Sequence, residues 1–233
     1  DVDPAGFAES LTWSQVYQRA QVVAEELLRH GRKGDRAAIL APQGLEYIVA
    51  FYGAMTAGFI AVPLPVPALG QLDERVNGAL RDCQPVAVLT TSAVVSDIMT
   101  YVGGFTGGAT PAVVEVDALD FHSPRTAEMN IGDLPEMAYL QYTSGSTADP
   151  KGVMVTHRSL VANAEGIMVH GLQTTHDDVG VSWLPLYHDM GLIGFVISPV
   201  IHGVSVVFIP TIRFIKRPSC WMETVHRHRG TIS

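Results

Sequence analysis

The chain has 233 residues and a mass of 25.1 kDa, and 47% of its residues are hydrophobic while 16% are charged. This composition excludes a disordered segment and a small disulfide-stapled protein, and the length is sufficient to bury a substantial core. The 15 lysines and arginines against 23 aspartates and glutamates give a formal net charge of −8, which provides no attraction to a phosphate backbone. We therefore expect no nucleic-acid partner.

The two cysteines and the first ten residues indicate in which cellular compartment the protein is located. Cys83 and Cys220 lie far apart and form no CxxC pair, so neither a disulfide framework nor a zinc site is indicated. His226 and His228 are two residues apart on an expected helix and point to different faces, so we expect no metal site there. Residues 1–10 lack the basic and then apolar stretches of a secretory signal. A reducing, cytoplasmic location is the simplest interpretation.

One segment, residues 192–210, is apolar enough to be considered for a membrane. It approaches the length of a spanning helix, but Pro199, His202 and Gly203 interrupt it in the middle. We interpret it as a helix, a turn and a buried strand, and we expect no integral membrane span.

Helical and strand-like patterns alternate along the first half of the chain. Apolar residues recur at steps of three and four from Trp13 to His30, which predicts an amphipathic helix. The patterns that follow predict strands at 37–41, 59–62 and 86–90 and helices at 44–57, 72–83 and 93–101. The glycine-rich residues 103–108 lack the spacing of a dinucleotide-binding loop and are expected to form a connector, and the polar residues 121–134 a surface excursion.

The alternation continues after residue 139. The patterns predict strands starting at Tyr139 and at 153–156, 179–183 and 204–209, and helices at 159–170, 190–197 and 218–229. This order predicts an α/β fold of largely parallel sheets covered by helices. Residues 231–233 resemble the start of another strand, so we expect the chain to be a fragment of a longer protein.

Residues 139–152 read YLQYTSGSTADPKG, an apolar strand that ends in hydroxyls, a glycine and a lysine. Hydroxyl donors, a glycine that lets backbone N–H groups approach an anion, and a positive charge together suit a polyphosphate. The residues concerned are Thr143, Ser144, Gly145, Ser146, Thr147 and Lys151. The spacing is not that of a Walker A loop. The composition alone fits a Ser/Thr-rich turn with a solvated lysine equally well.

Residues 182–194 read SWLPLYHDMGLIG and follow a β-branched strand. The imidazole of His188 could donate a hydrogen bond to a carboxylate or phosphoryl oxygen. The structural alternative is a histidine held by Asp189, with Asp189 as the N-cap of the next helix. The residues by themselves favour this alternative.

Both motifs resemble those of a known group of enzymes. YTSGSTADPKG is similar to the phosphate-binding signature of the adenylate-forming superfamily, which includes acyl-CoA synthetases, luciferases and the adenylation domains of peptide synthetases, although Ala148 stands where the usual form has a glycine. SWLPLYHDMGLIG resembles the next core motif of the superfamily. LPLYHDMGLIG, together with AVPLPVP at 61–67, is similar to the fatty acyl-AMP ligases, bacterial enzymes that hand fatty acids to polyketide or peptide synthases.

The resemblance extends over essentially the whole chain and implies a reaction. Residues 1–233 would be the N-terminal part of the large domain of an enzyme that joins a fatty acid to ATP, with release of pyrophosphate and with Mg²⁺ arriving with ATP. The acyl-adenylate would pass to an acyl carrier protein domain of a polyketide or peptide synthase. The adenine and ribose sites and the catalytic lysine would lie further along a longer chain, so this piece alone is expected to be inactive.

The resemblance also implies roles for single residues. The loop from Thr143 to Thr147 and Lys151 would hold the β- and γ-phosphates, and His188 would lie at the reacting centre. The residues expected near the acyl substrate are Tyr187, Asp189, Met190 and Gly191. Two alternatives stay open, an acyl-CoA ligase and a non-catalytic module that binds a nucleotide or an acyl group.

Overall fold

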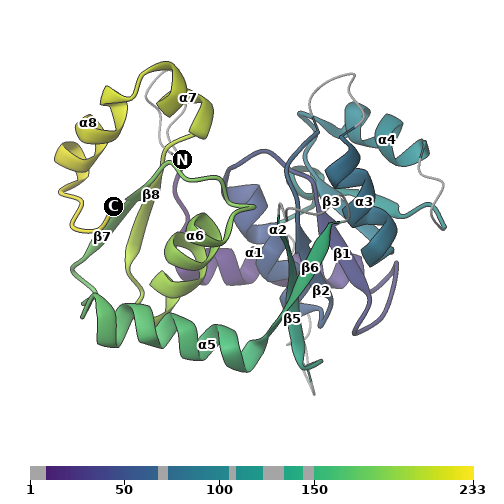
Figure 1. The fold of residues 1–233 in the computed structure, drawn as a ribbon, viewed down its shortest axis with the longest axis horizontal. Coiled ribbons are helices and arrows are strands. Elements are labelled where there is room, and N and C mark those ends of the chain that lie inside the picture. Colours follow the sequence, from purple (N-terminus) through teal and green to yellow (C-terminus); the bar gives the residue numbers. More distant parts are fainter. Residues whose placement is uncertain (1–8, 68–72, 105–108, 123–133, 144–149) are drawn as a thin grey trace. The chain divides into compact units, whose positions relative to one another are not determined.

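The computed structural model describes residues 9–67, 73–104, 109–122, 134–143 and 150–233 (Figure 1). They form two compact units, which are described separately. The larger contains Ser14–Pro42 and Glu46–His157, and the smaller contains the described residues 9–13 together with Gln43–Leu45 and Arg158–Ser233.

The larger unit is built on a six-stranded sheet with the strand order β4-β3-β1-β2-β5-β6. Its strands are β1 (Arg36–Ile39), β2 (Ile60–Pro63), β3 (Ala87–Thr90), β4 (Ala112–Glu115), β5 (Met137–Thr143) and β6 (Lys151–Thr156). Neighbours from β4 to β5 pair in parallel, while β6 pairs antiparallel with β5 at the edge. The predicted α/β fold with a largely parallel sheet is therefore confirmed.

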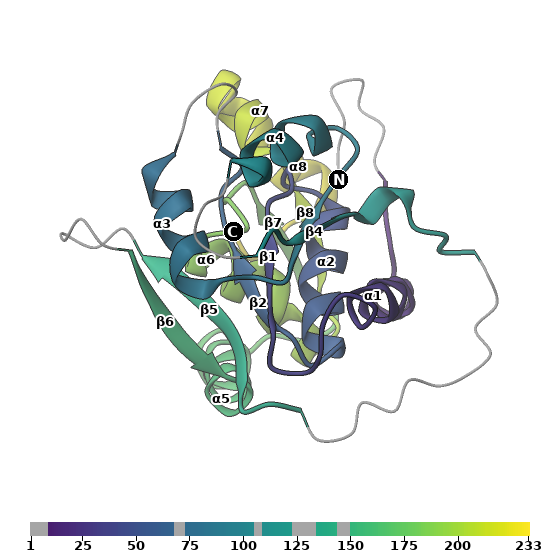
Figure 2. The same ribbon diagram turned by 90° about the vertical axis from the view of Figure 1, so that its right-hand side faces the viewer.

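Helices cover both faces of this sheet (Figures 1 and 2). The helices α1 (Trp13–Leu27) and α2 (Leu45–Thr56) lie on one face, and α3 (Glu74–Cys83) and α4 (Val95–Gly103) lie on the other. A short 3₁₀ helix, η1 (Val116–Ala118), follows β4. The first two helices approach closely, because a Cβ on Gly53 of α2 would lie 2.5 Å from the Cβ of Val23 of α1.

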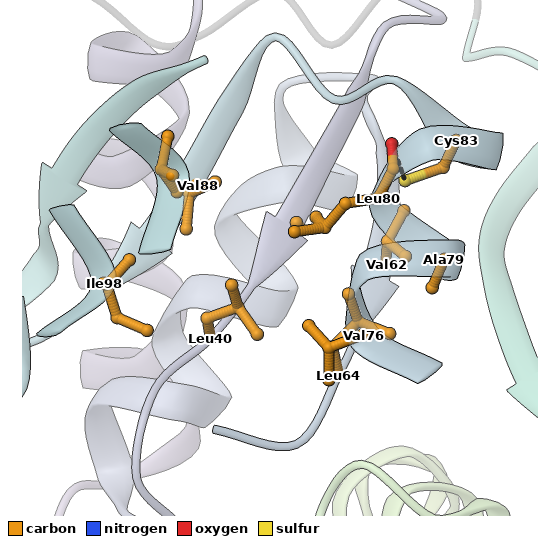
Figure 3. Close-up of a cluster of buried hydrophobic side chains, with 11 residues drawn as sticks. Leu40, Val62, Leu64, Val76, Ala79, Leu80, Cys83, Val88 and Ile98 are labelled. Carbon is orange, nitrogen blue, oxygen red and sulfur yellow. Dashed lines mark hydrogen bonds between the residues drawn. The ribbon is translucent and has the colours of Figure 1, made fainter. Parts of the chain in front are cut away.

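Beneath α3 and α4 lies a hydrophobic cluster contributed by both helices and the strands β1, β2 and β3 (Figure 3). Its buried members are Ala38, Leu40, Val62, Leu64, Val76, Ala79, Leu80, Cys83, Val88, Ile98 and Val102. On α3 the buried positions recur at steps of three, one and three residues, which places them on one helical face. Burial of this face fixes α3 on the sheet.

Both ends of α3 are also held by polar contacts. The carboxylate of Asp73 caps the first turn by accepting from the N–H groups of Arg75 and Val76, at 2.9 and 3.3 Å. At the other end, the guanidinium of Arg36 donates to the carbonyl of Cys83 at 2.7 Å and to that of Gln84 at 3.0 Å. The cap therefore stabilises the first turn of α3, and Arg36 of β1 ties the last turn to the sheet.

The smaller unit contains the parallel pair β7 (Val179–Ser182) and β8 (Ser205–Phe208), and Ile232 forms a parallel bridge to Gly180 of β7. Its helical segments are α5 (His157–Glu165), η2 (Gly166–Gly171), α6 (Asp189–Leu192), η3 (Ile193–Ile197), η4 (Ser198–Ile201), α7 (Thr211–Lys216) and α8 (Ser219–His228). Of these, η2 and η3 are π-helical and η4 is a 3₁₀ helix. The expected order of helix, turn and strand in residues 192–210 is confirmed, but the strand β8 is only partly buried rather than buried. The expected helix 190–197 is α-helical only to Leu192 and continues as a π-helix. None of the helices in the described ranges combines the length and apolar character needed to cross a membrane.

Three further features differ from the sequence-based prediction. The strand β6 begins at Lys151 rather than at 153 and forms a hairpin with β5. The short edge strand β4 and the six-residue helix α7 were not predicted. The expected helix 159–170 is α-helical only to Glu165 and continues as a π-helix.

Candidate functional site

The first part of the candidate site is the hairpin of β5 and β6. Thr143, the last residue of β5, is the register partner of Lys151, the first residue of β6, and both are exposed. Because β5 runs parallel to β2, Thr143 lies at the carboxyl end of a parallel strand, where ligands of α/β sheets commonly bind. The hairpin therefore brings Thr143 and Lys151 together, while Ser144, Gly145, Ser146 and Thr147 lie outside the described residues.

The β5 arm of the hairpin contacts α3 through a tyrosine. The hydroxyl of Tyr142 donates to Oδ2 of Asp82 at 2.5 Å. Burial and this hydrogen bond both raise the pKa of Tyr142, and burial raises the pKa of the neighbouring Cys83 thiol to about 12. Gly152, the register partner of Tyr142, leaves room for the ring, because a Cβ there would lie 3.1 Å from Cζ of Tyr142.

The β6 arm contacts the same helix through a proline. A Cβ on Gly78, in the middle of α3, would lie 2.7 Å from Cγ of Pro150, the residue before Lys151. Sequence reasoning did not identify Asp82, Gly78 or Pro150. The only local signal was a glycine inside a helical pattern, which marks a close approach of something to the helix.

The second part of the candidate site is the turn that follows β7. His188 has extended backbone angles (φ −97°, ψ 145°), and its carbonyl accepts from the N–H of Leu192 at 2.8 Å, so His188 itself is the N-cap residue of α6. The expectation that Asp189 caps this helix is wrong. Asp189 is the first helical residue, and its Oδ1 accepts from the N–H of Met190 at 2.8 Å.

The imidazole of His188 is exposed, and within the described ranges no hydrogen bond joins it to Asp189. Its ring lies 4.8 Å from that of Tyr187, centroid to centroid, at a tilt of 43°. Met190 is 67% exposed. The structural alternative for His188, a ring held by Asp189, is therefore not what the geometry shows, and the ring nitrogens are available to a ligand.

Gly191 explains how the turn is held. A Cβ at this position would lie 2.2 Å from the carbonyl oxygen of Pro185, so the turn packs directly against the backbone of α6. The same carbonyl accepts from the N–H of His188 at 3.3 Å. Only glycine permits this approach, which sets the position of His188 at the start of the helix.

An aromatic pair supports the beginning of the turn. The rings of Trp183 and Phe214 are stacked, with centroids 3.8 Å apart and an interplanar angle of 7°. The hydroxyl of Thr211 donates to the carbonyl of Trp183 at 2.8 Å. Both Phe214 and Thr211 belong to α7, so this unpredicted helix anchors the residue at which β7 leads into the turn. The described ranges contain no group of three or more His, Cys, Asp or Glu side chains placed to hold a metal ion.

The hairpin belongs to the larger compact unit and His188 to the smaller one. The chemistry of each is distinct. The hairpin presents a hydroxyl and an ammonium group, which suit phosphate oxygens, and the turn presents an imidazole that can donate to a single oxygen.

Comparison with known proteins identifies relatives along the whole chain. The profile of the family described as "AMP-binding enzyme" matches residues 2–233. The chain is 52% identical over 232 residues to a long-chain-fatty-acid–AMP ligase, FadD26, of Mycobacterium marinum. This match covers 98% of this chain and 40% of the relative. It is also 48% identical over 238 residues to a 4-hydroxyphenylalkanoate adenylyltransferase of Mycobacterium tuberculosis. That match covers 100% of this chain and 38% of the relative.

A solved structure shows the same fold. The crystal structure of a fatty acyl-adenylate ligase from L. pneumophila, in complex with acyl adenylate and pyrophosphate, matches with a TM-score of 0.81 at 30% identity and covers 96% of this chain and 38% of that chain. The chain thus spans about two fifths of the length of the proteins it matches.

Proposed function

Because the chain belongs to the AMP-binding enzyme family, we propose that its protein activates a long-chain fatty acid with ATP to give an acyl-adenylate and pyrophosphate. The observation that carries the proposal is the pairing of Thr143 with Lys151 at the carboxyl end of β5. A hydroxyl and an ammonium group meet there, on either side of a loop whose sequence is rich in hydroxyls. This donor set fits a polyphosphate.

The chemical step is attack by a carboxylate oxygen of the fatty acid on the α-phosphorus of ATP. A new bond forms between that oxygen and phosphorus, the bond from the α-phosphorus to the bridging oxygen breaks, and the electron pair leaves with pyrophosphate. Such a step depends on positioning and on stabilisation of negative charge more than on a protein nucleophile. Lys151 is suited to offset charge on the β- and γ-phosphates.

His188 is suited to the reacting centre. Its exposed ring, which Asp189 does not hold, can donate a hydrogen bond to a carboxylate or α-phosphoryl oxygen and stabilise the charge that builds up there. We propose that Tyr187, Asp189, Met190 and Gly191 lie near the acyl substrate. Mg²⁺ would arrive with ATP and neutralise part of the phosphate charge.

The proposal extends to the acceptor and the compartment. We propose an acyl carrier protein domain of a polyketide or peptide synthase as the acceptor, on the strength of the similarity to acyl-AMP ligases. We also propose a cytoplasmic location, which the two free cysteine thiols, both buried, support.

The test is to incubate the longest chain the gene encodes with ATP, Mg²⁺, a long-chain fatty acid and coenzyme A, and to identify the acyl products by mass spectrometry. We expect an acyl-adenylate that persists in the presence of coenzyme A. Formation of acyl-CoA would instead make the protein an acyl-CoA ligase. Absence of both products, and of ATP-dependent pyrophosphate exchange, from a folded protein would favour a non-catalytic binding module.

A further inference from the structure

A glycine interrupts helix α3 where a good helix former would be expected. Gly78 lies in the middle of α3, where glycine is less favourable than alanine by roughly 0.5–1 kcal/mol. The close approach of Pro150 gives the reason, because a Cβ on Gly78 would lie 2.7 Å from Cγ and 2.9 Å from Cδ of the proline ring. The β6 arm of the hairpin therefore rests on the backbone of α3 one residue before Lys151.

The β5 arm reaches the same helix one residue before Thr143. Tyr142 lies across Gly152 and donates its hydroxyl to the carboxylate of Asp82, near the C-terminus of α3. Tyr142 and Gly152 are register partners and share the sheet face on which α3 lies. The next pair, Thr143 and Lys151, projects on the other face, since side chains alternate along a strand.

Helix α3 is thus tied to both ends of the loop and is itself fixed. Asp73 caps its N-terminus, Arg36 holds its last carbonyls, and its buried face lies in the cluster of Figure 3. Figure 2 shows the helix beside one end of the hairpin formed by β5 and β6. Residues such as Thr143 and Lys151, whose strands are attached to a fixed helix, lose less conformational freedom when they bind a ligand.

We propose that α3 positions Thr143 and Lys151 for a phosphate group, by holding the two arms of the hairpin through the Asp82–Tyr142 hydrogen bond and the Gly78–Pro150 contact. This inference rests on the proposed function, because it assigns these residues to the binding of ATP. They are positioning residues, which do not touch ATP. When the hydrogen bond is lost, the binding-competent arrangement of the arms is less populated, and the apparent affinity for ATP falls by the same fraction.

The hydrogen bond is tested with Tyr142→Phe and Asp82→Ala in the longest chain the gene encodes. We expect each variant to raise the KM for ATP, measured by pyrophosphate exchange, by about fivefold. A change of this size is within the free energy that a hydrogen bond to a charged group contributes. The kcat and the KM for the fatty acid should change by less than about twofold. The double variant should be no worse than either single one, because both remove the same bond.

The matched control is Tyr101→Phe. Tyr101 donates its hydroxyl to the carbonyl of Asp73, at 2.9 Å, so the same atom is removed from a tyrosine that contacts α3 at its other end. Asp73 and Asp82 are nine residues apart, which is about 13 Å along a helix. We expect the KM for ATP of Tyr101→Phe to equal that of the unaltered protein. An equal rise in Tyr101→Phe and Tyr142→Phe would overturn the proposal, since it would show general loosening of α3.

The proline contact is tested with Gly78→Ala, alone and in a Pro150→Ala background. The added methyl group collides with the proline ring, so we expect Gly78→Ala alone to raise the KM for ATP about threefold or more. Pro150→Ala removes Cγ and Cδ, and in that background Gly78→Ala should have no further effect. An effect of equal size in both backgrounds would contradict the contact as its cause.

Hydrogen exchange separates this proposal from the proposed function. Amide exchange at residues 151–156 should be faster in Tyr142→Phe than in Tyr101→Phe or the unaltered protein, whether or not the enzyme turns over. If the unaltered protein shows neither exchange of pyrophosphate nor binding of ATP by calorimetry, the proposed function fails. Unchanged amide exchange in Tyr142→Phe would overturn the role of α3.

Discussion

At the scale of single residues, the exposed imidazole of His188 is the group of the second motif that we propose to contact a reacting oxygen. Removing it should weaken charge stabilisation in the transition state without disturbing the turn, because the backbone of His188 and not its side chain caps α6. We expect His188→Ala to lower the rate of adenylate formation by about tenfold or more. The rate is measured by pyrophosphate exchange in the longest chain the gene encodes.

The control for this variant is His176→Ala, since the side chain of His176 is 81% exposed and lies in the turn before β7. We expect its exchange rate to match that of the unaltered protein. An unchanged rate in His188→Ala would remove His188 from the mechanism. A loss of equal size in both variants would point to a general effect of the substitutions.

Gly191 gives a prediction about stability at the same scale. A Cβ would lie 2.2 Å from the carbonyl oxygen of Pro185 and 3.0 Å from its carbonyl carbon, and backbone atoms cannot move aside as a flexible side chain can. We expect Gly191→Ala to lower the free energy of unfolding by about 1–3 kcal/mol. Urea denaturation followed by circular dichroism measures the change.

A matched glycine lies three residues further along. A Cβ on Gly194 meets no atom within 4 Å, and this residue is also helical, within η3. Gly194→Ala should therefore leave stability unchanged or raise it by up to about 1 kcal/mol, as alanine does in helices. Equal losses in the two variants would show that the close approach of Pro185 is not the reason for Gly191.

At the scale of elements, local periodicity predicted most of the fold and failed where partners are distant in sequence. The helices α1 and α3 were predicted because their buried residues recur at helical spacing. The helix α7 was not, because it has no fully buried residue, and Phe214 finds its partner Trp183 more than thirty positions earlier. The four-residue edge strand β4 has one buried residue and gives equally little signal.

The same distinction applies to the candidate site. Local sequence drew attention to Thr143, Lys151 and His188, because hydroxyls, a lysine and a histidine follow apolar strands. It fitted a Ser/Thr-rich turn equally well and favoured a structural role for His188, so the predicted roles of these residues depended on the family resemblance. The N-cap position of His188 was not predicted, since Asp189 is as good a capping residue by type. The contacts of α3 with the hairpin depend on the strand order, which brings Gly78 beside Pro150 and Asp82 beside Tyr142.

The stacked pair gives a prediction for α7. Phe214→Leu keeps an apolar side chain but loses the stacking on Trp183, which is worth about 0.5–1.5 kcal/mol beyond the area buried. We expect a loss of stability of that size and an altered near-ultraviolet circular dichroism signal from Trp183. The control is Ile215→Ala on the same helix, since Ile215 is 65% exposed and should change stability by less than about 0.5 kcal/mol. A larger loss in Ile215→Ala than in Phe214→Leu would contradict the anchoring role of the pair.

At the scale of the whole molecule, the chain combines two compact units that carry different parts of the proposed chemistry. The larger unit carries the hairpin with Lys151, and the smaller carries His188 and the turn. Adenylate formation needs phosphate binding and stabilisation at the reacting centre to act on one ATP molecule. We therefore expect the proposed reaction to depend on groups from both units.

That dependence gives a prediction for residues 1–233 on their own. The relatives that form acyl-adenylates by name are about two and a half times as long, because the chain spans 40% of one and 38% of another. We expect the isolated 233 residues to show no pyrophosphate exchange above background under conditions in which the longest chain the gene encodes turns over. Both proteins are compared at equal concentration, with far-ultraviolet circular dichroism to establish that the shorter one is folded. Robust turnover by the isolated residues would refute this expectation, since it would mean that Lys151, His188 and the units that carry them provide every contact the reaction requires.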